Sequence, residues 1–471
     1  MAHDAAAPLL PPAPAMPDAP RRKRFAFVCA TLASMTTILM GYNHALMSGA
    51  QLFIQEDLGL SDVQVEVLTG SMNLFTLVSI LGAGWTADLL GRRGTLLLAN
   101  AFLMAGALAM SLGGTYAALM AARFVTSVGF GFSRVIAPVY NAEISPASKR
   151  GVLSSMFDMF LNVGILLSYV SNYALAGLPV HVGWRVMFAI GALPPAFLAA
   201  GVHAMPESPR WLVMRGRHAE ARAVLVRTSD TPTEADLRLG EIMQQAVQAG
   251  CGAWKEMLVR PTKSVRRVLT CVVGLQFFQQ ASGIDAIVLY SPLVFKKAGM
   301  SSNSAILGAT VAVGVVKTCF ILVATLFSDL VGRRPLLLAS AAGIALTLAS
   351  LALALCVGAT STLSTAACAV ASVLAFVAAF SVGFGPLPST YSSEIMPLRL
   401  RAQGTAFSMT VNRVVCGLVT LTFISLADWI TMPGCFFLYA GVAAAAYAFV
   451  YVHLPETSGR SLEDMEVLFA K

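Results

Sequence analysis

Charge is scarce in this sequence, and that scarcity excludes a soluble protein. Only 12% of the 471 residues are Asp, Glu, Lys or Arg, whereas a soluble domain carries about 25%. Hydrophobic residues make up 57%, and the mean hydropathy is +0.73. Apolar runs of about 20 residues predict helices that span a membrane, since lipid offers no hydrogen-bond partner to an exposed backbone.

Paired cysteines and clustered histidines are also lacking. The eight cysteines are scattered, mostly inside apolar runs, and form no Cys-x-x-Cys pair. We therefore expect buried small hydrophobic side chains rather than a disulfide framework or a metal site. The six histidines are scattered too, whereas a membrane acyl- or glycosyltransferase would need clustered His, Ser or Asp at one membrane face. The sequence thus predicts neither an enzyme nor a bound cofactor or metal.

Twelve apolar segments predict twelve transmembrane helices. They fall at 25–49, 64–87, 94–112, 116–142, 151–175, 184–204, 266–296, 303–328, 334–357, 365–392, 402–427 and 433–453. We expect an all-α integral membrane protein with a disordered Ala- and Pro-rich tail (1–24), a six-helix bundle (25–204), a cytoplasmic linker with short helices (205–265), a second six-helix bundle (266–453) and a C-terminal tail (454–471).

Basic residues are distributed unevenly between the two sides. With the N-terminus in the cytoplasm, the inner segments hold 25 Lys and Arg, while the outer loops hold only Lys296 and Lys297. Cytoplasmic loops carry such an excess. We therefore expect a multi-pass membrane protein with both termini in the cytoplasm, and we do not interpret the net charge of +8 as a sign of a nucleic-acid partner.

The two halves share short motifs in the same order. The Asp-x-x-Gly-Arg-Arg motif at 88–93 recurs at 329–334, and Pro-Glu-Ser at 206–208 recurs as Pro-Glu-Thr at 455–457. A glutamate and an arginine, seven residues apart at 143 and 150, recur at 394 and 401. Two related halves are what a transporter of the rocking type needs, with its substrate held between them near the midplane.

These motifs resemble those of the major facilitator superfamily, and specifically its sugar porter family, over about residues 25–468. Pro-Glu-Ser-Pro-Arg-Trp (206–211) and Gln-Gln-Ala-Ser-Gly-Ile-Asp (279–285) add to the match. The stretches 164–173, 282–292 and 392–404 look most like those of plant polyol and monosaccharide transporters. The resemblance implies two six-helix bundles and a carrier of sugar alcohols or monosaccharides that works by alternating access. Many plant members are proton symporters.

Charged residues at the cytoplasmic helix ends have two interpretations. They fix the topology and contact lipid headgroups, or, as the resemblance implies, they form ion pairs that close the inner gate in the outward-open state. The residues concerned are Asp88, Arg92, Arg93, Glu143, Arg150, Glu207, Asp329, Arg333, Arg334, Glu394, Arg401 and Glu456.

Polar side chains inside the spans are candidates for solute binding, because burying them in a membrane is costly. Sugars and polyols need amides, carboxylates and hydroxyls that point in fixed directions. By resemblance the ligands are Gln279, Gln280, Asp285 and Asn412, together with Asp158 and with Ser389 in place of an expected tryptophan. The alternative role is hydrogen bonding between helices, which uses the same residue types.

Glycine and proline interrupt two of the spans beside these residues. The seventh span contains Ser282-Gly283 and Pro292, and the tenth contains two glycines and two prolines between 383 and 388. Such breaks are tolerated where the backbone lines a cavity. We expect both helices to bend over bound solute as local gates.

Energy coupling is expected to depend on charges within the spans. In proton-coupled relatives an arginine at the position of Arg123 pairs with an acid on the first span, but that position is Asn43 here, followed by His44. Uncoupled transport is the first hypothesis, and coupling through another carboxylate, Asp158, is the second. Arg134 is expected to face Asp158, and Lys317 and Arg413 to find Asp285 or backbone carbonyl groups.

One alternative function stays open, a transport-inactive sensor on the same fold that binds solute without moving it. The expected partners are a small polyol or monosaccharide, protons if transport is coupled, and the lipid bilayer. We expect a functional monomer in the plasma membrane.

Overall fold

The structure is a computed structural model of the whole chain, and it describes residues 19–144, 150–229, 231–248, 261–357, 362–396 and 400–456. The first half contains α1 (Ala19–Leu58), α2 (Asp62–Leu112), α3 (Tyr116–Ile144), α4 (Arg150–Leu175) and α5 (Val180–His203). Three short helices follow, α6 (Pro209–Met214), α7 (His218–Thr228) and α8 (Pro232–Gln248). The second half contains α10 (Lys263–Ala281), α11 (Ile284–Leu289), α12 (Ser291–Lys297), α13 (Asn303–Val331), α14 (Arg333–Val357), α15 (Thr362–Val382), α16 (Leu387–Ile395), α17 (Arg401–Ile430) and α18 (Met432–His453).

The helices have the lengths that membrane crossing requires. Nine helical stretches of the described residues are long and apolar enough to cross a bilayer. One of them, α2, has 51 residues, which at 1.5 Å per residue is about 75 Å, more than twice the thickness of the hydrocarbon core. It turns at Gly91, where φ is 83°, and so provides two crossings. With α1 and α4, the helices make the twelve-helix membrane fold that the sequence predicts.

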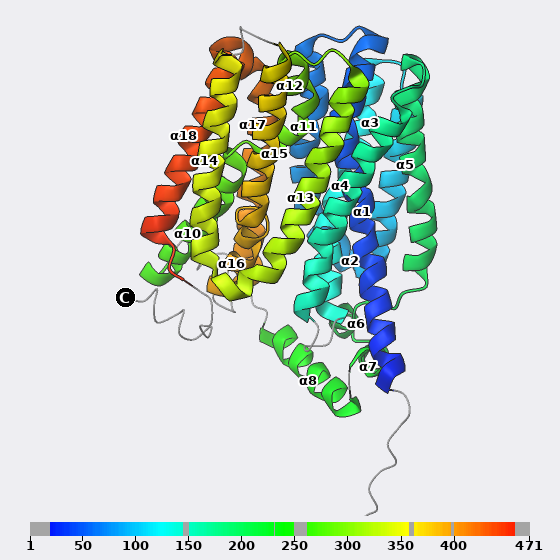
Figure 1. Cartoon of the computed structure of the whole chain (residues 1–471). Helices are drawn as coiled ribbons and strands as arrows, with labels where there is room; N and C mark the ends of the chain where they lie inside the picture. The colour runs from blue at the N-terminus through cyan, green and yellow to red at the C-terminus, as the bar shows by residue number, and fades with distance from the viewer. Residues whose placement is uncertain are drawn as a thin grey trace, which may run out of the picture.

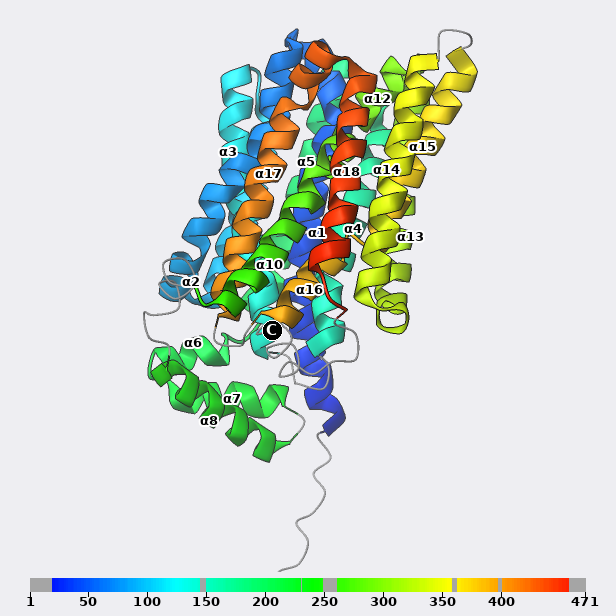
Figure 2. The ribbon, with the colours of Figure 1, turned by 90° about the vertical axis from the view of Figure 1, so that its left-hand side faces the viewer.

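The two halves lie side by side with their long helices roughly parallel (Figure 1). In the first half α1 packs against α4 and α5, and α2 against α3. In the second half α14 packs against α15 and α18. The halves meet along two seams, α2 with α17 and α4 with α13, and Figure 2 shows the first of them. Figures 1 and 2 both show α6, α7 and α8 beyond one end of the bundle.

Glycines let α1 and α4 approach closely. A side chain on Gly41 would collide with the carbonyl of Leu161, and one on Gly164 would collide with the carbonyl of Ile38. Small residues at such positions allow helices to pack backbone to backbone, which matters in lipid because no hydrophobic force drives the helices together. This contact fixes the position of α4, which carries Asp158 into the space between the halves.

Two sequence-based expectations differ from the structure. The first helix begins at Ala19, inside the segment expected to be a disordered tail, while residues 1–18 and 457–471 lie outside the described residues. Of the seven described cysteines, all are free, but Cys319, Cys356 and Cys368 are exposed on the helix surfaces rather than buried. An apolar side chain can face lipid as readily as a protein core, so an apolar run does not predict burial inside the protein.

Candidate functional site: a polar cavity between the halves

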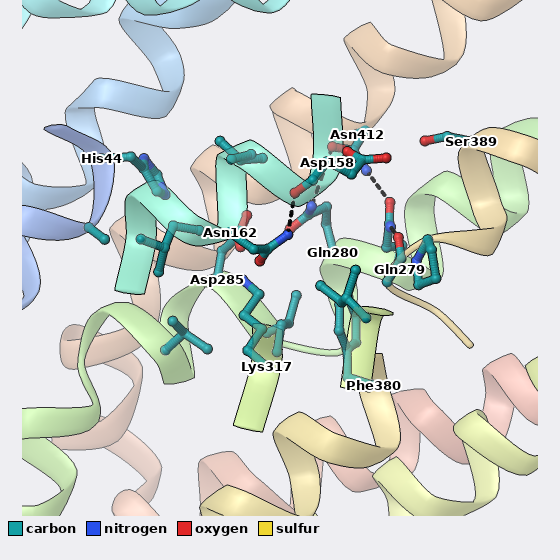
Figure 3. Close-up of a pocket in the computed structure, with 18 of the residues that line it drawn as sticks. His44, Asp158, Asn162, Gln279, Gln280, Asp285, Lys317, Phe380, Ser389 and Asn412 are labelled. Carbon is teal, nitrogen blue, oxygen red and sulfur yellow. Dashed lines mark hydrogen bonds between the residues drawn. The ribbon is translucent and has the colours of Figure 1, made fainter. Parts of the chain in front are cut away.

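A polar cavity lies between the two halves, beside the breaks in two spans. Its lining comes from α1, α3 and α4 in the first half and from α10, α11, α13, α15, α16 and α17 in the second. Figure 3 shows labelled side chains from both halves converging on this space. All the residues that the sequence assigned to solute binding line it, namely Gln279, Gln280, Asp285, Asn412, Asp158 and Ser389.

Asn412 on α17 is the centre of a buried amide network. Its Nδ2 donates to Gln276 Oε1 at 2.9 Å and to Gln279 Oε1 at 2.8 Å. Its Oδ1 accepts from the guanidinium of Arg413, with Nε at 3.1 Å. Because the amide both donates and accepts, Asn412 fixes the orientation of the glutamines on α10, which would meet a hydroxyl-bearing solute.

Gln280 links this network to Asp285. With one amide orientation its Nε2 donates to Asn412 Oδ1 at 3.3 Å. With the other orientation its nitrogen donates to Asp285 Oδ2 at 3.0 Å, and its oxygen accepts from Arg413 at 3.2 Å. We adopt the second orientation because it satisfies both polar atoms. Asp285 Oδ2 also accepts from the thiol of Cys416 at 2.9 Å.

Gln279 connects the cavity to both helix breaks. The seventh span is interrupted between α10 and α11 at Gly283, whose φ is 82°, and the tenth is interrupted between α15 and α16. Gln279 Nε2 donates to two carbonyl groups at the second break, Phe384 O at 2.7 Å and Gly385 O at 3.0 Å. A side chain in the cavity therefore holds the two interrupted spans together.

Five charged side chains line the cavity, namely Arg134, Asp158, Asp285, Lys317 and Arg413. Over the described part of the chain, none of them lies within 4.0 Å of an opposite charge. Arg134 and Asp158 share the cavity as expected but form no ion pair there, and the buried Arg134 Nε has no hydrogen-bond partner among the described residues. Arg413 binds Asn412 instead of Asp285.

The residues expected to couple transport to protons are divided between two places. His44, Arg134 and Asp158 line the cavity, with the His44 ring 5.5 Å from that of Phe130. Arg123 is buried elsewhere and donates to the carbonyls of Leu68 and Thr69 on α2, both at 3.3 Å. Asn43 donates to the carbonyl of its own helix at Leu39, at 3.0 Å. Arg123 thus binds backbone oxygens rather than the side chain at position 43.

Charged residues cluster at the end of the bundle that carries α6, α7 and α8. Arg92 Nε lies 3.1 Å from Glu143 Oε2, and its Nη1 lies 3.3 Å from Asp88 Oδ1. Glu143 also accepts from the hydroxyl of Ser208. These contacts join α2, α3 and the segment before α6, and none of them reaches a helix of the second half.

Glu207 and Glu456 each accept hydrogen bonds from two backbone N–H groups at the start of a helix. Glu207 Oε1 accepts from the backbone N–H groups of Arg92 at 2.9 Å and of Arg93 at 3.1 Å. Glu456 accepts from the corresponding groups of Arg333 and Arg334, both at 3.0 Å. The first N–H groups of a helix have no partner within it and carry partial positive charge, so a carboxylate satisfies them.

Both copies of this carboxylate contact need a glycine. Gly91 has φ of 83° and Gly332 has φ of 97°, a region that other residues rarely adopt. A side chain at either position would also meet the glutamate carboxylate.

The side chains of Arg150, Asp329, Glu394 and Arg401 lie outside the described residues. Arg93 contacts His203 Nδ1 at 3.2 Å, and Arg334 donates to the carbonyl of Tyr451 at 2.8 Å.

Two buried polar residues, one lining the cavity and one in the seam between the halves, were missed in the sequence. Gln276 lines the cavity and binds Asn412, and its position one helical turn before Gln279 could have placed it on the same face. Glu66 is only 1% exposed, and its carboxylate contacts α17 in the other half. It is a single charge near the start of an apolar run, and no motif marks it.

The fold and the site define a polytopic membrane carrier with a polar binding cavity between two helix bundles. The family described as "Sugar (and other) transporter" matches residues 29–469, and the chain belongs to this family.

Relatives in plants cover nearly the whole chain. It is 49% identical to "Polyol transporter 5" of Arabidopsis thaliana, over 98% of this chain and 91% of that protein. It is 51% identical to "Putative polyol transporter 1" of the same plant, over 96% and 93%.

Among solved structures, the bacterial xylose carrier XylE has the same fold. One structure, of the proton:xylose symporter bound to 6-bromo-6-deoxy-D-glucose, matches with a TM-score of 0.78 and 26% identity, over 95% of this chain and all of that one. An inward-open structure of XylE from E. coli matches with a TM-score of 0.79 and 25% identity, over 94% of this chain and all of that one.

Proposed function

We propose that this protein carries a sugar alcohol or a monosaccharide across the plasma membrane, with both chain termini in the cytoplasm. The observation that carries this proposal is the cavity between the halves, where Gln276, Gln279, Gln280 and Asn412 present amide groups beside carboxylates. Such a lining suits a solute with many hydroxyl groups, since each amide can both donate and accept. The Arabidopsis relatives are named as polyol transporters, which supports a polyol.

In the proposed cycle, hydroxyl groups of the solute bind the α10 amides from one side and Asp158 on α4 from the other. Solute binding competes with the contacts of Gln279 to the Phe384 and Gly385 carbonyls, which frees the tenth span to bend. The bundles at 25–204 and 266–453 then rock about the bound solute, while the linker at 205–265 keeps them joined on the cytoplasmic side. No covalent step is involved.

Proton coupling through Asp158 is a second candidate, because one observation favours it. The Asp158 carboxylate lines the cavity and, within the described residues, forms no ion pair, so its charge is free to respond to solute or to a proton. The XylE relative is named as a proton symporter. Asn43 does not titrate, and Arg123 binds backbone carbonyls. Facilitated, downhill transport is the alternative that position 43 favours.

Uptake into a transport-deficient cell tests both statements. Labelled sorbitol, mannitol, xylose and glucose are offered with and without an imposed pH gradient, and with a protonophore as control. Uptake of at least one of these solutes is expected, and uptake of none of them would contradict the carrier. Concentrative uptake that collapses with the protonophore, and that Asp158→Asn converts into downhill uptake, supports coupling through Asp158. Uptake that does not depend on the imposed pH gradient supports facilitated transport.

A further inference from the structure

One carboxylate on the outer side of the membrane lies inside the seam between the halves. Glu66 is on the second turn of α2, and its partners are on α17 near the end opposite to α6, α7 and α8. It is 1% exposed and contacts no basic side chain within 4.0 Å among the described residues. A buried carboxylate needs several hydrogen-bond donors to offset its lost hydration.

The donors come from the other half. Glu66 Oε1 accepts from the backbone N–H of Ile424 at 2.6 Å and from that of Ser425 at 3.1 Å. Glu66 Oε2 accepts from the Ser425 hydroxyl and, at 3.3 Å, from the Ser425 N–H. In a regular helix these two N–H groups would donate to the carbonyls of Thr420 and Leu421.

A carbonyl in the same turn of α17 is also bound by another element. The hydroxyl of Tyr290, between α11 and α12, donates to Thr420 O at 3.0 Å. The Tyr290 ring stacks on that of Phe423, with centroids 5.3 Å apart and planes 5° from parallel. A helix bends where side chains enter its hydrogen-bond ladder. Both ends of one potential helical bond, the Ile424 N–H and the Thr420 carbonyl, therefore have partners outside α17.

We propose that Glu66 holds the outer side of the carrier closed, and we call Glu66, Tyr290, Thr420, Ile424 and Ser425 the outer latch. In the closed state the latch satisfies the carboxylate through α17. When α17 moves away, the carboxylate becomes hydrated and the two N–H groups return to the carbonyls of their own helix. Each state satisfies every group, so the latch has two arrangements, as a switching element requires. Glu66 is a positioning residue, since it lies outside the cavity lining and acts through α17.

The packing around the outer latch is consistent with an interface between α2 and α17 that can open and close. Gly70 on α2 lies against Leu421 on α17, and Gly417 on α17 lies against Leu74 on α2. Asn73 Nδ2 donates to Thr420 Oγ1 at 3.1 Å. Close approach through small residues makes this seam tight enough to exclude water, while its polar contacts are few. Removing the Glu66 carboxylate therefore removes a large share of what holds the outer side closed.

The test measures the two sides of the membrane separately. This inference rests on alternating access, but cysteine labelling needs no transported solute, so it can fail or succeed independently of the uptake experiment. Ser48, buried in the outer seam with its hydroxyl 3.3 Å from Val288 O, is changed to Cys as the outer reporter. Met409, which lines the cavity on the inner half of α17, is changed to Cys as the inner reporter. The exposed Cys319, Cys356 and Cys368 are first replaced by Ala.

Glu66→Ala is expected to raise the labelling of Ser48→Cys by an impermeant outer reagent about tenfold. It should also lower the labelling of Met409→Cys from inside. Loss of buried hydrogen bonds shifts the equilibrium between the outward-closed and outward-open states by about this factor. Ser425→Ala should change the labelling of both reporters in the same direction, by about threefold. This second variant keeps the test decisive if Glu66→Ala does not fold. Glu56→Gln, an exposed glutamate at the same end, is the matched control and should change neither. Unchanged labelling at both reporters in both latch variants would overturn the proposal, and so would a rise at both, because a loosened protein labels from both sides.

Discussion

The two ends of the helix bundle, one carrying Glu66 and the other carrying α6, α7 and α8, are held together in different ways. At the end that carries Glu66, hydrogen bonds cross from one half to the other, from Gln51 to Leu289 O at 3.2 Å and from α17 to Glu66. At the end that carries α6, α7 and α8, the ion pairs of Arg92 with Glu143 and Asp88 stay within the first half. Among the described residues, polar contacts therefore join the two halves at the end of the bundle that carries Glu66. In the proposed cycle, the contacts that cross between the halves at the Glu66 end break when the outer side opens.

The largest loss of transport is expected from a change in the cavity between the two ends, at Asn412. Asn412→Ala removes the group that orients Gln276, Gln279 and Arg413, and each buried polar atom left unpaired costs roughly 1–3 kcal/mol. Uptake of labelled polyol at low concentration should fall by at least about tenfold, with an unchanged amount of protein at the cell surface. Thr422→Ala, on the exposed face of the same helix, is the control. Normal uptake by Asn412→Ala would remove this cavity as the solute site.

A change on the cytoplasmic side should act with the opposite sign to a change in the outer latch. Arg92→Gln removes the contacts of Arg92 with Glu143 and Asp88. If these carboxylate and guanidinium groups close the inner side in the outward-open state, the carrier should shift toward inward-open. Labelling of Met409→Cys from the cytoplasm should rise about threefold, which lies in the range of energies measured for single ion pairs. Arg217→Gln in the exposed linker is the control, and equal labelling in both variants would argue for a purely topological role.

A smaller effect is expected from the two charges that face the cavity from the first half. Arg134→Leu and Asp158→Asn each remove one of two opposite charges that line the same cavity. If the two interact, the double variant should be less impaired than the sum of the single ones, by a coupling energy of about 0.5–3 kcal/mol. The measurement is a double-mutant cycle on the KM for uptake. Strict additivity would show that the two side chains act independently in spite of sharing the cavity.

The sequence predicts a structural feature only where that feature requires a recognisable pattern of residues. The twelve crossings were predictable because lipid forces apolar runs of a set length. Gln279 was predictable as a cavity residue, but its contacts with Phe384 and Gly385 were not, since a backbone carbonyl has no sequence signature. The same holds for Glu207, whose partners are N–H groups at a helix start 115 residues away.

Glu66 shows the limit most plainly. It is one charge at the margin of an apolar run, and that position is also where an ordinary interfacial residue would occur. Its donors are interior N–H groups of α17, more than 350 residues further along the chain. Only the packing of α2 against α17 brings the Glu66 carboxylate and these N–H groups together. The contact therefore cannot be predicted from the sequence of either segment alone.

Exchange in proteoliposomes tests the carrier most directly. Vesicles that contain the purified protein are loaded with unlabelled sorbitol, mannitol or glucose in turn and diluted into a trace of the same labelled solute without any ion gradient. A carrier that alternates around a central site must show transient accumulation of label for at least one solute, and Asn412→Ala must abolish it. Saturable binding of a solute to the protein without any such exchange would contradict transport and would establish the sensor instead.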